Sequence, residues 1–134
     1  MKKTFKNIEL MEINNAITKM QESATRFPAR VLWNLKINKK RITDVLTVCA
    51  ECEKEIKAEY STDDKSTISE ENPEMRTVRP EYLQEFQTKI FELNMQETDI
   101  DINTVPFSLV EDIDMTPTEW TAIEFMIVED NNLV

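Results

Sequence analysis

The amino-acid sequence predicts a mainly α-helical fold of the α+β class. In this fold a long second helix and a third helix form an antiparallel hairpin, accompanied by flanking helices and a small two-stranded β element. Three observations predict it. Apolar residues recur every three or four positions in four segments, nothing between Pro28 and about Tyr60 breaks a helix, and "ETDIDINTV" alternates like a strand. A chain of 134 residues is most simply one helical domain, 1–134, which can bury a core without disulfides or a structural metal.

The first predicted helix is capped by Asn7 and ends near "QESATR". Its apolar residues Leu10, Ile13, Ile17 and Met20 are spaced by three, four and three positions. This spacing places them on one stripe of the helix, so we expect that stripe to be buried.

The second predicted helix begins at Pro28, which is tolerated in a first turn, and runs to about Tyr60. Spacings of four and three alternate along it over nearly four heptads, and we call these positions the seam. The seam residues are Val31, Leu35, Asn38, Ile42, Val45, Cys49, Cys52 and Ile56. Asn38 is the polar member: it is either a partly exposed residue near the helix start or a residue that specifies register or partner.

Cys49 and Cys52 form a C-x-x-C pair, the pattern of zinc sites and redox couples. A tetrahedral zinc site needs two more ligands, but the chain has no other cysteine and no histidine. A thioredoxin-type couple needs its first cysteine at a helix N-terminus, whereas Cys49 lies about 20 residues inside the predicted helix. We therefore expect both residues to be thiols of the core, with no metal bound.

Segment 61–79, "STDDKSTISEENPEMRTVR", is polar and is predicted to be a mobile excursion. Pro80 opens the third helix, which is expected to lie antiparallel against the second half of helix two. The strand "ETDIDINTV" then alternates Ile100 and Ile102 with polar residues, and its only nearby partner is "KKTFKN", with Phe5 facing inward.

The C-terminal helix has the clearest start signal in the chain. Thr116 is the N-cap, Pro117 the first residue, and Glu119 closes the capping box. One face of the helix then carries Trp120, Ile123 and Ile127.

Two missing residue types argue against an enzyme. Without glycine the chain cannot form a Walker loop, a dinucleotide-binding turn or a nucleophile elbow. Without histidine it lacks the usual general base near neutral pH and the commonest metal ligand. We therefore expect a non-catalytic protein with no cofactor.

The composition also bears on where the protein acts. No stretch approaches the roughly 20 continuous apolar residues of a membrane span, and the N-terminal "MKKTFKNIEL" has no signal-type apolar block. Two cysteines in 134 residues do not make a disulfide scaffold. We expect a soluble cytoplasmic protein without a membrane partner.

The net charge of −10 is unevenly distributed. Residues 1–43 carry ten basic and three acidic residues, a net charge of +7, and residues 44–134 carry six basic and 23 acidic residues, a net charge of −17. Charge runs usually face water, but this asymmetry can also steer a partner or favour head-to-tail self-association. An acidic region that mimics a nucleic-acid backbone would bind a basic protein, so nucleic acid itself is not an expected partner.

The basic stretch "NLKINKKR" (34–41) directly follows Trp33, and Arg30 lies three residues before that tryptophan. Aromatic and basic side chains together can hold a phosphate or a base. The candidate residues for a nucleotide-like ligand are Arg30, Trp33, Lys36 and Lys40. Lysines on the wet face of a helix explain the same pattern.

The length of helix two predicts an interface. Residues 28–60 as one helix span about 50 Å, whereas a compact chain of this size has a diameter of about 36 Å. Some apolar seam positions are therefore expected to stay exposed, and exposed apolar stripes usually mark interfaces. The predicted interface, in a homodimer or with a host protein, consists of Val31, Leu35, Asn38, Ile42 and Val45.

The segments follow one another in a recognisable order. After "FKNIEL" come an apolar helix, "FPARVLWNLKINKKR", a long charged helix, a polar excursion, a helix, an isoleucine-alternating strand and "MTPTEWTAIEFMIVED". This layout covers most of the chain and resembles small uncharacterised proteins of tailed bacteriophages, whose excursion usually contains "dG", which is missing here. The resemblance implies phage origin and action in the host cytoplasm or in assembly, and it implies no catalytic residues.

Three function classes follow from these observations. The favoured one is a non-catalytic interaction protein of the phage type, which inhibits a host defence component by binding it. The alternatives are a protein that sequesters a nucleotide-like ligand and a virion or assembly component.

Overall fold

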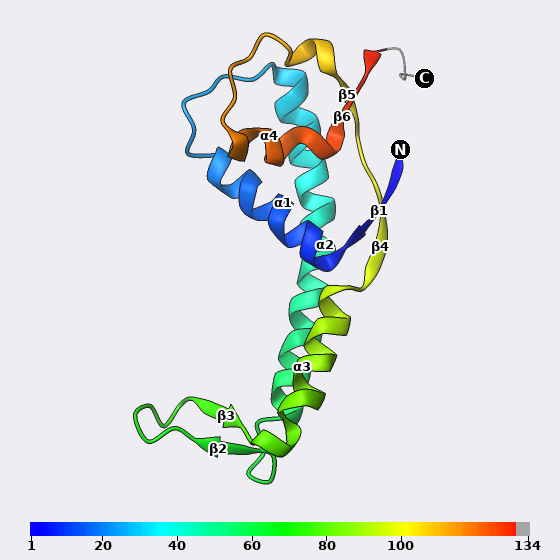
Figure 1. The fold of residues 1–134 in the computed structure, drawn as a ribbon. Helices are drawn as coiled ribbons and strands as arrows, with labels where there is room; N and C mark the ends of the chain where they lie inside the picture. The colour runs from blue at the N-terminus through cyan, green and yellow to red at the C-terminus, as the bar shows by residue number, and fades with distance from the viewer. Residues whose placement is uncertain (131–134) are drawn as a thin grey trace. The chain divides into compact units, whose positions relative to one another are not determined.

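The fold is mainly α-helical with small two-stranded sheets, which confirms the predicted class (Figure 1). The computed structural model describes residues 1–130. The helices of this range are α1 (Asn7–Met20), α2 (Ala29–Glu59), α3 (Pro80–Asn94) and α4 (Pro117–Ile123), with 3-10 turns at Phe107–Leu109 and Glu124–Met126. The strands are β1 (Lys2–Lys6), β2 (Ser66–Ile68), β3 (Arg76–Val78), β4 (Glu97–Asp101), β5 (Val105–Pro106) and β6 (Ile127–Val128).

The packing divides the chain into two compact units. The first unit contains residues 1–46 and 97–130, and the second unit contains residues 47–96. Helix α2 therefore contributes its N-terminal part to the first unit and its C-terminal part to the second. The sequence alone predicts a single domain, because a continuous helix carries no local signal of such a division.

Strands β1 and β4 form the predicted two-stranded element. They pair antiparallel, with Phe5 opposite Thr98 and Lys3 opposite Ile100. Phe5 and Ile100 are buried, whereas Asp99 on the alternate face is exposed. The alternation in the sequence thus identified both the strand and its inward face.

Helices α1 and α4 pack against each other in the first unit. Helix α1 includes Asn7 as its first residue rather than its cap, and the carboxylate of Glu9 accepts a hydrogen bond from the backbone N–H of Lys6 (2.9 Å). Helix α4 begins as predicted: the Thr116 hydroxyl accepts from the backbone N–H of Glu119, and the Glu119 carboxylate accepts from the backbone N–H of Thr116, both at 3.2 Å.

Helix α2 supplies the central wall of the core of the first unit. Its first turn is closed by the carbonyl of Pro28, which accepts from the backbone N–H groups of Val31 and Leu32 at 3.0 and 3.1 Å. Buried apolar side chains that α1 and α2 contribute to this core are Leu10, Ile17, Met20, Val31, Leu35 and Ile42. The stripe predicted for the first helix is therefore confirmed at its buried positions.

The C-terminal segment departs from the predicted helix. Helix α4 ends at Ile123, and Ile127 lies in strand β6, which pairs parallel with β5 so that Ile127 is opposite Val105. The prediction that Trp120, Ile123 and Ile127 share one helical face was therefore wrong for Ile127. Ile127 and Val128, the residues of β6, are β-branched and favour extended backbone, and their partner strand β5 lies 22 positions earlier in the sequence.

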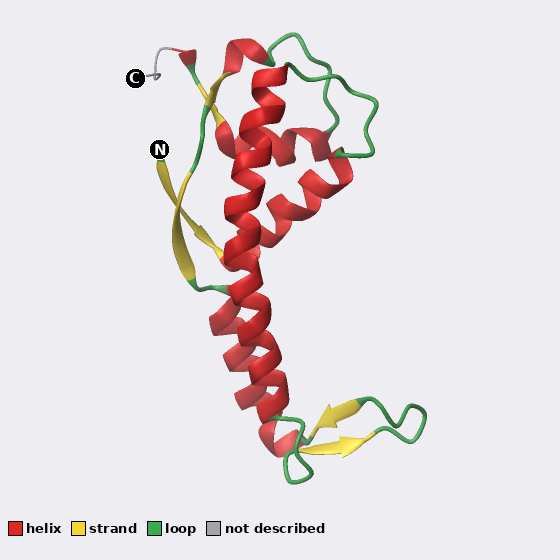
Figure 2. Cartoon of the chain, turned by 180° about the vertical axis from the view of Figure 1, so that it is seen from behind, coloured by secondary structure: helices red, strands yellow, loops and turns green. Residues whose placement is uncertain are grey.

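In the second unit, α3 lies along the C-terminal part of α2 (Figures 1 and 2). Pro80 is the first residue of α3, as predicted. The rings of Tyr60 and Phe86 meet edge to face at 5.3 Å between centroids, and the Lys89 ammonium pairs with the Glu59 carboxylate at 3.0 Å. These contacts join the two helices of the predicted hairpin.

Segment 61–79 contains an antiparallel hairpin of β2 and β3 (Figure 2), which the sequence analysis did not predict. Its loop makes a turn at Asn72, whose carbonyl accepts from the backbone N–H of Met75 (2.9 Å) and whose side-chain oxygen accepts from that of Glu74 (3.2 Å). Among the described residues no backbone φ is positive. The turn therefore forms without glycine.

Cys49 and Cys52 occupy the seam positions predicted for them. Cys49 is buried, Cys52 is half-buried, and both thiols are free. Burial raises the pKa of the Cys49 thiol, and the nearby Glu53 and Cys52 raise it further. Low thiolate content makes Cys49 a slow nucleophile.

Within residues 1–130, no helix combines the length and the apolar composition needed to cross a bilayer.

Candidate functional site

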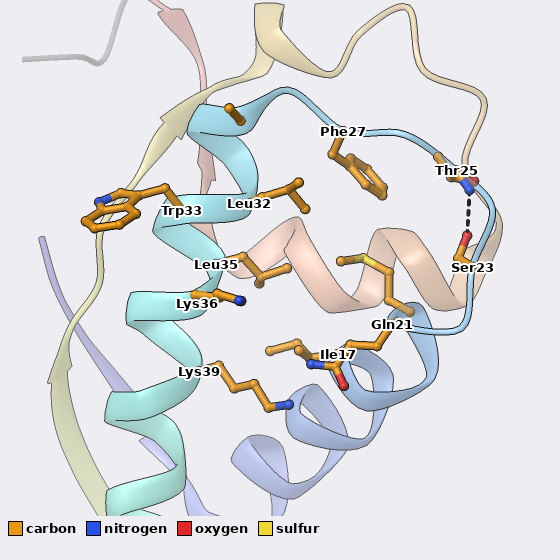
Figure 3. A pocket seen from close by; sticks show the side chains of 12 residues that line it. Ile17, Gln21, Ser23, Thr25, Phe27, Leu32, Trp33, Leu35, Lys36 and Lys39 are labelled. Atoms are coloured by element: carbon orange, nitrogen blue, oxygen red, sulfur yellow. Dashed lines mark hydrogen bonds between the residues drawn. The ribbon is translucent and has the colours of Figure 1, made fainter.

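A pocket of about 470 Å³ lies in the first unit between α1, the connector 21–28 and the N-terminal part of α2 (Figure 3). We call it the α1–α2 pocket. Its apolar lining consists of Ile17, Met20, Phe27, Ala29, Leu32 and Leu35, with Trp33 also in contact. Its polar lining consists of Gln21, Ser23, Thr25, Lys36 and Lys39.

The base of the pocket is continuous with the core. Ile17, Met20 and Leu35 are buried core residues, and the Phe27 ring packs against the same core. In Figure 3 the side chains of Phe27, Leu32 and Leu35 extend toward the same space. Leu32 is 45% exposed, so the pocket opens to solvent with an apolar rim.

Two ammonium groups provide the charge of the pocket. Lys36 and Lys39 are the charged residues that line it, and no carboxylate is among its lining residues. Neither ammonium forms an ion pair within the described chain. In Figure 3 both side chains extend from α2 toward the side of α1. The pocket is therefore apolar inside and cationic at one edge.

The connector wall is held by a buried carboxylate, Glu119, which is 4% exposed. The Ser23 hydroxyl donates to it (3.1 Å), and the same hydroxyl accepts from the backbone N–H of Thr25 (3.0 Å; Figure 3). The pKa of the Glu119 carboxyl is held below its usual range, chiefly by a hydrogen bond from the Thr25 side chain, with Thr116 and Ser23 adding and burial opposing the shift. The capping box of α4 thus also fixes the pocket wall.

Glu119 predicts a pH-dependent stability. Because its pKa is lowered by folding, the stabilisation is complete above the unfolded value of about 4.3 and is lost as pH falls through the folded value. We expect the wild-type protein to have a higher urea midpoint than Glu119→Gln at pH 7, and this gap to narrow toward pH 3. Glu124→Gln, which removes an exposed carboxylate nearby, serves as the control. It should leave the urea midpoint unchanged both at pH 7 and at pH 3. A gap that is equal at both pH values would show that the charge of Glu119 is not what holds the wall.

The four residues predicted to bind a nucleotide-like ligand are only partly brought together. Lys36 and Trp33 line the pocket, but the Trp33 ring projects from the opposite side of α2 to Phe27 and is 68% exposed (Figure 3). Arg30 and Lys40 are exposed on α2 and do not line this pocket. Sequence reasoning missed Phe27, whose position before the helix start carries no periodic signal.

Four of the five predicted interface residues are buried inside the first unit. Val31, Leu35, Asn38 and Ile42 are each at most 5% exposed, and Val45 is half-buried against the same core. The expectation that these seam positions stay uncovered is corrected, because α1, α4 and the segment after β4 contribute to the core that encloses them.

Asn38 serves the fold of its own chain. Its side-chain amide donates to the backbone carbonyl of Asn103 (2.9 Å) and accepts from the backbone N–H of the same residue (2.8 Å). Arg41, one turn further along α2, donates to the carbonyl of Asp101 and to the side chain of Asn103. These bonds tie the segment after β4 to α2. The polar seam position therefore specifies an internal register.

The second unit exposes a different surface. Helix α3 has no buried residue, although it carries an apolar stripe. Leu83 is 42% and Phe91 63% exposed, and Val48 of α2, in the same unit, is 58% exposed. Exposed carboxylates accompany them at Glu51, Glu55, Glu59, Glu81, Glu85 and Glu92. We call α2 from residue 47 onward together with α3 the hairpin surface.

No group of three or more His, Cys, Asp or Glu side chains in residues 1–130 is arranged to hold a metal ion. Comparison of the chain with protein families, curated proteins and solved structures finds no match.

Proposed function

We propose that this chain is a non-catalytic interaction protein that binds a basic protein partner through the hairpin surface. The observation that supports this proposal is α3, a helix of 15 residues in which none is fully buried and in which Leu83 and Phe91 are exposed. Helices of this length are marginal in isolation and owe most of their stability to tertiary packing of an apolar face. A partner that covers Leu83 and Phe91 would supply that packing.

Charge supports a basic partner rather than a second copy of the same surface. The two segments that form the hairpin surface, 47–59 and 80–94, together contain seven acidic and three basic residues, a net charge of −4. Two such surfaces facing each other would repel, whereas a basic surface would be attracted and its association accelerated. Self-association through this surface is therefore the weaker alternative.

The layout resemblance to tailed-bacteriophage proteins extends this proposal. It implies that the protein acts in the host cytoplasm, and inhibition of a host defence component by binding is the role we propose there. The alternative function, sequestration of a nucleotide-like ligand, has less support. The interior of the α1–α2 pocket is apolar, and Arg30 and Lys40 lie outside it.

A retention experiment tests the proposal. Immobilised wild-type protein should retain a basic protein from bacterial lysate, and Leu83→Glu and Phe91→Glu should reduce the affinity at least about 30-fold, as central apolar contacts do. Ile8→Glu is the matched control, since Ile8 is 49% exposed in the first unit and should leave retention unchanged. The retained protein is then purified and its affinity measured directly for each variant.

Salt dependence provides the second readout of the same experiment. Exposed charges are screened within about 10 Å at 0.1 M salt, so the partner should be released steeply as salt rises. If wild-type protein, Leu83→Glu and Phe91→Glu retain the partner equally, the partner does not bind through the hairpin surface. Tight binding that does not change with salt would count against a basic partner.

A further inference from the structure

We propose that the α1–α2 pocket binds a small amphipathic carboxylate, with its hydrocarbon body inside the pocket and its carboxylate at Lys36 and Lys39. This inference goes beyond the docking function, because it concerns a site in the first unit and a small molecule.

The interior of the pocket matches a hydrocarbon body. Ile17, Met20 and Leu35 form an apolar base, and Phe27 and Leu32 form apolar walls. A volume of about 470 Å³ lies in the range of about 300–1,000 Å³ that small-molecule sites occupy. Burial of a hydrocarbon chain against these side chains removes apolar surface from water, which is favourable.

The edge of the pocket matches an anion. Lys36 and Lys39 line it from the same helix, three residues apart, and neither ammonium has an anionic partner among the residues that the structure describes. Residues at this spacing are neighbours on a helix surface. The residues that line the pocket include these two cations and no carboxylate, so an anionic head group at this edge faces cations alone among the lining side chains.

The connector wall is preorganised for a ligand. Its Ser23 is held by Glu119, and Glu119 is held in turn by the cap of α4. The Ser23 hydroxyl is therefore already fixed in the wall, and fixed groups lower the entropic cost of binding.

The pocket suits a hydrocarbon better than a nucleotide base and phosphate. The Trp33 ring, the expected stacking platform, projects from the other side of α2 to Phe27 (Figure 3). Of the four cationic and aromatic residues first predicted for a nucleotide-like ligand, only Lys36 reaches the pocket as a cation.

Nuclear magnetic resonance titration of the full chain with octanoate tests the inference. We expect saturable binding, with the largest backbone amide shifts within residues 17–39. Lys36→Gln/Lys39→Gln should weaken octanoate binding about tenfold, because it removes both cations that line the pocket. The matched control is Arg30→Gln/Lys40→Gln, which removes the same charge from the same helix outside the pocket and should leave the affinity within about twofold.

Two further arms separate the contributions of body and head group. 1-Octanol, which has the same body without the charge, should bind the wild-type protein more weakly than octanoate and should bind both double variants equally. Ala29→Trp, which fills the pocket at an exposed lining position, should abolish octanoate binding while leaving the urea midpoint unchanged.

Several results would overturn the inference. These are no saturable octanoate binding, equal weakening by the two double variants, octanoate binding no tighter than that of 1-octanol, or amide shifts centred outside residues 17–39. Displacement of octanoate by adenosine monophosphate at equal concentration would also overturn the inference, and it would assign the pocket to a nucleotide-like ligand instead.

Discussion

Ile42→Glu is expected to unfold the first unit rather than to release a partner. Ile42 has no exposed surface and packs in the core with Val31 and Leu35. An unpaired carboxylate at this position loses its hydration without gaining a counter-ion, and the lost apolar packing adds to the cost. We expect a loss of at least about 5 kcal/mol, a large fraction of the stability of a typical domain.

Near-ultraviolet circular dichroism and urea unfolding measure this effect, and Val48→Glu is the control. Val48 lies on the same helix but is 58% exposed, so its substitution should change stability by no more than about 0.5 kcal/mol. Light scattering after size exclusion measures the opposite result. In that case the wild-type protein would be a homodimer, and the Ile42→Glu variant would be a folded monomer. That result would restore the seam as an interface between copies.

Asn38→Ala is expected to destabilise the first unit by about 2–3 kcal/mol. The Asn38 amide satisfies both the backbone N–H and the backbone carbonyl of Asn103, and alanine leaves both groups without this partner. An unsatisfied buried polar group costs about 1–3 kcal/mol, and partial access of water to Asn103 moderates the sum.

The control for Asn38→Ala is Asn15→Ala, an exposed asparagine on α1. Both variants gain the same helix propensity, so the difference between their urea midpoints isolates the bonds to Asn103. Amide hydrogen exchange should also rise at Asn103 in Asn38→Ala and remain unchanged in Asn15→Ala. Equal midpoints for the two variants would contradict an internal register role for Asn38.

Local signals in the sequence were sufficient to place the starts of α3 and α4 and the strand β4. Pro80 opens α3, the Thr116–Glu119 capping box opens α4, and the alternation around Ile100 marks β4. Each of these signals acts within a few residues, through a fixed backbone angle, a cap hydrogen bond or the alternation of side chains across a strand. They therefore remain readable without knowledge of the rest of the fold.

Tertiary packing decided what the local signals could not. The heptad spacing of Leu35 and Ile42 determined by itself that one stripe of α2 is apolar, but it did not determine that the chain's own α1 and α4 take part in covering it. The end of α4 at Ile123 and the joining of Phe27 to Lys39 in one pocket likewise depend on partners distant in sequence. The spacing of apolar residues predicts which face of an element is buried. Which segment covers that face depends on the packing of the whole unit.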